Sequence, residues 1–244
     1  MQNLKEILQE VQGQQKASAK NTIEPLFDPD YVRKKFIEIL NSKCLKNSFG
    51  VRGLELNSEN ERAIELVCQY FNREKKFNEQ GSDQEFSFYK GLWFYGNFGS
   101  GKTLIVDTYR EISKLFKKEI VGIKTCQQMN EAFMKVDPAA AKMEGMNGIK
   151  AFCNKFDPNE RIFDDLGEEE TTIQSYGNKF SVMAHILSER HKGSRNGVLT
   201  HVTTNLSKQQ ISKHYGGRIE SRIFEMFNMI KLGASSDSID YRKK

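Results

Sequence analysis

The hydrophobic positions along the chain follow two patterns, one at helical spacing and one in short continuous runs. A first helix is predicted after Asp28-Pro29, because Asp28 can cap a helix and Pro29 suits its first position. A second is predicted from Ser58, which can form a capping box with Glu61. The predicted inward-facing residues of the two helices are Val32, Phe36, Ile39, Leu40, Ala63, Ile64, Val67, Cys68, Tyr70 and Phe71.

Apolar runs of the length of core strands occupy residues 92–95, 119–123, 161–163 and 198–204. Segments with helical periodicity follow three of them, over residues 104–116, 127–135 and 208–214. Strands alternating with helices predict an α/β fold, with a parallel sheet sandwiched by helices. Residues 137–159 mix alanines and glycines with scattered apolar residues, and we interpret them as a helical excursion before the next strand.

The first residues carry a narrow apolar stripe of Leu4, Ile7, Leu8 and Val11, which predicts a short amphipathic helix over residues 2–12. The polar run over residues 13–21 is typical of a linker. We therefore predict two parts, a helical appendage with linker over residues 1–50 and the main domain over residues 51–244. The appendage either docks on a partner or packs against its own domain.

Composition narrows the class of protein. The 244 residues carry a net charge of +5, which is consistent with nucleic-acid contact without requiring it. The four cysteines lie far apart, so we expect reduced thiols and no zinc site. The start of the chain lacks the apolar core of a signal peptide, and no run approaches the roughly 18 apolar residues of a membrane span. We expect a cytoplasmic protein without membrane contact.

A phosphate-binding loop follows the run at residues 92–95. Glycines allow the backbone N–H groups to point inward around phosphates, and the N-terminus of the following helix adds partial positive charge. Lys102 is expected to neutralise the outer phosphates, and the Thr103 hydroxyl is expected to bind Mg²⁺. The loop reads Gly96, Asn97, Phe98, Gly99, Ser100, Gly101, Lys102 and Thr103, a complete G-x-x-x-x-G-K-[ST] match.

Polar side chains after two later strands supply the rest of a hydrolytic site. Asp164 is predicted to anchor Mg²⁺, and Asp165 to position or polarise the attacking water. If the strand at residues 198–204 lies between the other two, Asn205 falls beside the γ-phosphate, where its amide could hold the water. Asn205 and Ser207 also precede a helix, so an ordinary helix cap is the alternative interpretation.

The segment Arg218-Ile-Glu-Ser-Arg222 completes a set of motifs. Together with the phosphate loop, Asp164-Asp165-Leu-Gly and Thr203-Thr204-Asn205, it resembles AAA+ ATPases of the DnaC and IstB type, relatives of the DnaA initiator. The resemblance implies an AAA+ core without a C-terminal helical lid. It also implies a homo-oligomer with ATP at subunit interfaces, in which Arg222 is the arginine finger and Arg218 supports it.

This resemblance implies a DNA-binding ATP hydrolase with ATP and Mg²⁺ at its site, active only on assembly and with DNA. One candidate function is a replicative helicase loader that assembles on single-stranded DNA and a helicase ring. The alternative is an IstB-like ATPase that regulates a transposase, and a third is a nucleotide-gated switch without hydrolysis. A GTPase is disfavoured because the Asn-Lys-x-Asp motif at residues 154–157 precedes the acidic pair, whereas GTPases place it after.

Overall fold

The computed structural model describes residues 24–45, 56, 58–80, 85–116, 121–135, 149, 152–153, 160–170, 173–175, 178–194 and 196–233. Five strands form one parallel sheet in the spatial order β2-β3-β6-β1-β7. The phosphate-loop strand β1 therefore lies inside the sheet, paired with β6 and β7. The strands are β1 (Gly91–Gly96), β2 (Val121–Thr125), β3 (Arg161–Leu166), β6 (Thr200–Thr204) and β7 (Phe227–Leu232).

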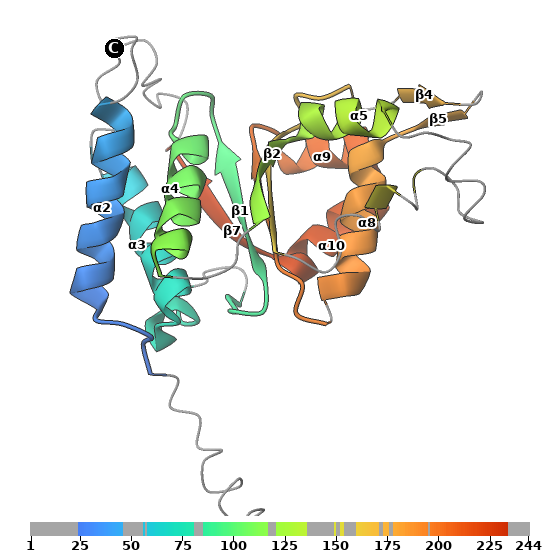
Figure 1. The fold of residues 1–244 in the computed structure, drawn as a ribbon. Helices are drawn as coiled ribbons and strands as arrows, with labels where there is room; N and C mark the ends of the chain where they lie inside the picture. Colours follow the sequence, from blue (N-terminus) through green and yellow to red (C-terminus); the bar gives the residue numbers. More distant parts are fainter. Residues whose placement is uncertain are drawn as a thin grey trace, which may run out of the picture.

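Helices cover both faces of the sheet (Figure 1). On one face lie α2 (Pro29–Leu45), α3 (Ser58–Asn72) and α4 (Lys102–Leu115). On the other lie α5 (Cys126–Met134), α8 (Val182–Ser194), α9 (Lys208–Tyr215) and α10 (Gly217–Met226). The described residues also contain a short 3-10 helix, Lys75–Phe77, and a hairpin of β4 (Ile173–Ser175) with β5 (Asn178–Phe180).

Successive side chains of β1 point to opposite faces and divide the core in two. Leu92 and Phe94 pack in the hydrophobic cluster that α2, α3 and α4 contribute to, whereas Trp93 packs in the cluster that includes α5, α8, α9 and α10. This two-residue alternation is the geometry of a strand buried on both sides. The predicted α/β fold, a parallel sheet sandwiched by helices, is confirmed.

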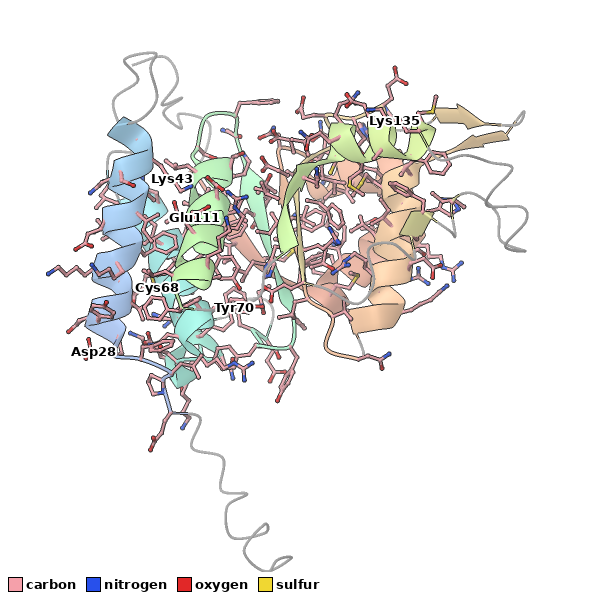
Figure 2. The ribbon with its side chains drawn as sticks, viewed as in Figure 1. Asp28, Lys43, Cys68, Tyr70, Glu111 and Lys135 are labelled. Atoms are coloured by element: carbon pink, nitrogen blue, oxygen red, sulfur yellow. The ribbon has the colours of Figure 1, made fainter. Side chains whose placement is uncertain are left out.

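Helix α2 packs on α3 and α4 as part of the first cluster. Val32, Phe36 and Leu40 are fully buried there. Lys43 forms an ion pair with Asp107 of α4 and lies near Glu111 of the same helix (Figure 2). The predicted appendage thus includes a helix that packs on the main domain. The boundary near residue 50, and the helix and linker over residues 2–21, lie outside the described residues.

The predicted helix starts agree with the structure at Pro29 and Ser58. Asp28 caps α2 through Oδ1, which accepts the N–H of Tyr31 at 2.8 Å. Strand β2 and helix α5 each differ slightly from the predicted bounds. Of the excursion predicted at residues 137–159, only Ile149, Phe152 and Cys153 are described. All three are helical; Phe152 and Cys153 are buried in the hydrophobic cluster that includes Trp93, and Ile149 packs against it. The motif at residues 154–157 lies outside the described residues.

Candidate nucleotide-binding site

The phosphate loop joins the end of β1 to the start of α4, as the sequence predicts. Gly99 and Gly101 have φ angles of 72° and 89°, in the left-handed region that glycine adopts readily. Gly96 also has a positive φ, 144°, and in addition a Cβ there would lie 1.9 Å from the carbonyl oxygen of Leu232 on β7. The glycines therefore allow the loop backbone to pack closely against β7 and to adopt the shape of a phosphate-binding cradle.

Lys102 is the first residue of α4, and its side chain is turned into the loop. Nζ donates hydrogen bonds to the carbonyl oxygens of Gly96 at 2.9 Å and Asn97 at 2.7 Å, and to Oγ of Ser100 at 3.3 Å. The loop thus holds the ammonium group at its centre. This is where a cation is needed to neutralise phosphate oxygens.

Asp164 links the phosphate loop to the two neighbouring strand ends. Its Oδ1 accepts the hydroxyl of Thr103 at 3.1 Å and the hydroxyl of Thr203 on β6 at 2.5 Å. Burial raises the pKa of Asp164 above its ordinary range, the bond from Thr203 opposes that shift, and the nearby charge of Asp165 adds to it. A cation beside this carboxylate would relieve the cost of its buried charge.

The residues present fit a magnesium ion bound together with a nucleotide. Mg²⁺ takes oxygen ligands, and at such sites the protein supplies only one or two of them while phosphates and waters supply the rest. Thr103 and Asp164 place two oxygens 3.1 Å apart next to the loop. The described residues hold no group of three or more His, Cys, Asp or Glu that could bind a metal ion without a nucleotide.

Asp165 follows in a left-handed backbone conformation, with φ 54°. Asp and Asn tolerate this region better than other residues with a Cβ. The N–H of Asp165 donates to Oγ1 of Thr203 at 2.9 Å, so this hydroxyl contacts both members of the acidic pair. Thr203 therefore orders the end of β3 from the neighbouring strand.

Asn205 lies just beyond β6, which the sheet places between β1 and β3 as the prediction requires. Its Nδ2 donates to Oε1 of Glu168 at 3.3 Å. Its Oδ1 is buried without a hydrogen-bond partner among the described residues, a feature that an ordered water would satisfy. The helix cap is Ser207, whose hydroxyl accepts the N–H of Gln210 at 3.4 Å. Because Ser207 is the cap of α9, the helix-cap interpretation does not explain why an asparagine occupies position 205.

Sequence reasoning assigned no contact to three side chains around the acidic pair, although one of them, Thr204, stands within a recognised motif. Thr204 Oγ1 donates to the carbonyl oxygen of Leu166 at 2.6 Å, Glu168 contacts Asn205, and Glu169 Oε2 accepts the N–H of Gly167 at 2.8 Å. The only signal for them in the sequence is their position within or directly beside recognised motifs. The contacts of Thr204 and Glu168 join residues 38 and 37 positions apart, so no local pattern reveals them.

The two predicted arginines lie on α10, which packs against α8 and α9. Arg222 donates a hydrogen bond to the Ser188 hydroxyl of α8, and Arg218 is exposed. Within the described part of the chain neither arginine is hydrogen-bonded to the phosphate loop. The fold thus brings together the loop, Asp164, Asp165 and Asn205, and keeps the arginine pair on a separate helix.

The fold and the loop define a P-loop α/β protein with the geometry of a nucleotide site. No protein-family model matches the chain, and no curated protein does. Among the described helices, none has the length and apolar composition needed to cross a membrane.

Several solved structures are similar in fold. AMPPCP-bound DnaA from Aquifex aeolicus matches with 15% identity and a TM-score of 0.49, over 73% of this chain and 48% of that chain. The DnaC helicase loader matches with 22% identity and a TM-score of 0.45, over 72% and 92% of the two chains. DnaI matches with 20% identity and a TM-score of 0.45, over 81% and 90%. This chain therefore spans about half of that DnaA chain and most of the other two.

Proposed function

We propose that this protein is a P-loop ATP hydrolase. The observation that supports the proposal best is the contact of Asp164 with Thr103 of the phosphate loop and with Thr203 of the intervening strand. It brings the loop, an acidic pair and a polar strand end to one edge of the sheet. Each of the three has a distinct task in phosphoryl transfer.

The residues divide those tasks. The loop amides and Lys102 bind the phosphates, and Thr103 with Asp164 would hold Mg²⁺, whose charge offsets that of the phosphate oxygens. Asp165 and the unpartnered Oδ1 of Asn205 are suited to orient a water for attack on the γ-phosphorus. The proton of that water passes to a carboxylate, and we assign this step to Asp165.

The position of Arg218 and Arg222 supports the hypothesis that each ATP site is shared between two subunits. Arg222 and Arg218 lie on α10 and are not hydrogen-bonded to the phosphate loop in the described part of the chain. By the sequence resemblance, Arg222 serves the site of a neighbouring subunit. Arginine fingers supply roughly 10³ to 10⁵ in rate, so an isolated subunit should hydrolyse ATP slowly.

Two variants test the shared site. Lys102→Ala should lose nucleotide binding, and Arg222→Ala should bind ATP normally but lose roughly 10³-fold in stimulated phosphate release. Mixing them should restore turnover, because each Arg222→Ala site can then receive the arginine of a Lys102→Ala neighbour. Arg62→Ala, at an exposed position on α3, is the matched control. Normal turnover of Arg222→Ala alone would refute its role.

We propose further that the protein acts as a replicative helicase loader, with ATP-dependent assembly on single-stranded DNA and a helicase ring. The motif resemblance supports this role, and it supports regulation of a transposase as the alternative. A pull-down with the full chain distinguishes them, since recovery of a ring helicase favours the first and of a transposase the second. The full chain is the better bait because α2, within residues 1–50, packs on the main domain.

A nucleotide-gated switch without hydrolysis is tested with Asp165→Asn. This change keeps a residue that tolerates the left-handed backbone and removes only the charge. If Asp165 accepts the proton of the attacking water, phosphate release should fall at least 10²-fold while ATP affinity is retained. If the wild type with DNA and partner releases no phosphate, the hydrolase proposal is wrong.

A further inference from the structure

A buried hydrogen bond connects the acidic end of β3 with the end of α9. Glu169 and Tyr215 are both buried, and the Tyr215 hydroxyl donates to Oε1 of Glu169 at 2.5 Å. The other carboxylate oxygen, Oε2, accepts the N–H of Gly167 at 2.8 Å. Glu169 has no ion-pair partner among the described residues, so its two oxygens depend on these two donors.

One end of this contact lies in the hydrolytic part of the site. We call residues 165–169 the acidic turn. Within it Asp165 has a positive φ, its carbonyl oxygen accepts the N–H of Glu168 at 3.2 Å, and Glu168 contacts Asn205. The Glu169 carboxylate holds the turn through Gly167. Any change in this turn that moves Glu169 also moves its bond to Tyr215.

The other end lies at the start of the helix that carries the arginines. Tyr215 is the last residue of α9, and Gly216, with φ 84°, separates it from α10. Nothing lies within 4 Å of a Cβ built at Gly216, so this link is free of side-chain packing. Burial raises the pKa of Tyr215, with Glu169 adding to the shift, and the hydroxyl therefore remains a donor.

We propose that Glu169 and Tyr215 form a positioning pair that couples the acidic turn of each subunit to its own α10, and so to the arginines that serve the next subunit. The inference rests on the proposed function. Nucleotide in one site would then set the orientation of the arginine helix offered to the neighbouring site. A buried carboxylate held by only two donors suits this task, because both bonds must be present for it to remain satisfied.

Hydrogen exchange tests the coupling in the full chain, at a concentration where light scattering shows monomers. In the wild type, a non-hydrolysable ATP analogue with Mg²⁺ should slow amide exchange in the phosphate loop, the acidic turn and α10. In Tyr215→Phe the phosphate loop should keep its protection, and exchange in α10 should be roughly tenfold faster than in the nucleotide-bound wild type, the equivalent of one buried hydrogen bond. Glu169→Gln is the second variant.

Tyr109→Phe is the matched control. Tyr109 is also buried, and its hydroxyl donates to a carboxylate, Glu160, at 3.1 Å, but it lies on α4 and does not contact the acidic turn. It should respond to the analogue as the wild type does. The inference is overturned if α10 is protected equally in Tyr215→Phe, or if it is unprotected in the wild type while the loop is protected. Absence of protection at the loop itself would overturn the proposed function and this inference together.

Kinetics supply a readout that a purely structural role would not change. Tyr215→Phe should lower the kcat of stimulated hydrolysis roughly tenfold with an unchanged KM for ATP. Mixing it with Asp165→Asn should restore turnover per competent site, because the Asp165→Asn neighbours still bind nucleotide and therefore offer correctly oriented arginine helices. A defect that mixing does not restore would place the effect of Tyr215 in its own site and contradict the proposed coupling.

Discussion

At the scale of single residues, the buried carboxyl group of Asp164 is an unfavourable place for a charge in the nucleotide-free domain. Asp164 is 4% exposed as a residue, and its carboxylate accepts bonds from the hydroxyls of Thr103 and Thr203 and from backbone. Burial raises its pKa above the ordinary value of 3.8. Compared with the unfolded chain, the native state disfavours the ionised form of Asp164, so ionisation of this carboxyl reduces stability as the pH rises above 3.8.

Asp164→Asn should raise the thermal midpoint of the nucleotide-free protein in EDTA at pH 7. The advantage should disappear as the pH falls through the raised pKa of Asp164 toward 3.8, where the wild-type carboxylate is itself neutral. Calorimetry at several pH values measures this. The same variant should bind Mg²⁺-ATP more weakly than the wild type.

Glu131→Gln is the control for Asp164→Asn, because it removes the same charge from an exposed position on α5. Its midpoint should follow the wild type at every pH. A wild type more stable than Asp164→Asn at pH 7 would show that the carboxylate is stabilising as an ion, which contradicts the direction of the shift.

The residues that a motif carries were predictable, and those that only the fold brings together were not. Lys102, Thr103 and Asp164 stand in patterns whose chemistry is local, and the structure places Thr103 in contact with Asp164, beside the loop that holds Lys102. Thr203, which contacts both Asp164 and Asp165, and Tyr215 were not assigned such contacts. They lie 39 and 46 residues from Asp164 and Glu169, their respective partners, and no spacing rule spans that distance.

At the scale of elements, the acidic turn is held in place by close packing on the segment after β6. A Cβ added at Gly167 would lie 2.5 Å from Cδ1 of Leu206, and Gly167 has φ 103°. Gly197, in the turn before β6, also has a positive φ, 82°, but nothing lies within 4 Å of a Cβ built there. A side chain added at Gly167 therefore meets both a steric clash and backbone strain, whereas one added at Gly197 meets backbone strain alone.

Gly197→Ala should cost about 1–2 kcal/mol of unfolding free energy, from the left-handed backbone alone. Gly167→Ala should cost more and should also reduce ATP turnover, because the side-chain clash displaces the acidic turn. Leu206→Ala, combined with Gly167→Ala, should recover part of that additional loss. Chemical denaturation and phosphate release measure both effects. Equal costs for the two alanine variants would mean that Leu206 moves aside without consequence.

Helix starts were predictable, and some strands were not. Asp28-Pro29 predicted the start of α2, because the capping bond that Asp28 accepts from the N–H of Tyr31 is local, and α3 begins at the predicted Ser58. Strand β7 was not predicted, although it pairs with the phosphate-loop strand over six positions. Its side chains Phe227, Ile230 and Leu232 are buried on both faces of the sheet, so the alternation of polar and apolar residues that marks a half-exposed strand is absent.

At the scale of the whole molecule, α2 and the sheet form one packed body. Phe36 of α2 is fully buried in the first cluster, and the single tryptophan, Trp93, is fully buried in the second, across the sheet. Fluorescence of Trp93 therefore reports on the side of the domain that α2 does not touch. A substitution at Phe36, followed by the fluorescence of Trp93, can therefore test whether the domain unfolds as a unit.

Phe36→Ala should lower the unfolding midpoint reported by Trp93 fluorescence by roughly 10 °C, because a fully buried phenylalanine contributes about 3–5 kcal/mol. The transition should remain single and coincide with the loss of helical circular dichroism. Lys34→Ala, on the exposed side of the same helix, should leave it unchanged. An unchanged Trp93 midpoint in Phe36→Ala would mean that α2 is an independent appendage.

The positive φ of Asp165 also limits how this site can vary between related proteins. A residue with a longer or branched side chain at this position would have to adopt a backbone conformation that it disfavours. Evolutionary substitution at position 165 should therefore stay within aspartate, asparagine and glycine. If Asp165 accepts the proton as proposed, lineages that lose hydrolysis but keep nucleotide binding are expected to carry asparagine or glycine there, and this one codon would then mark catalytic competence.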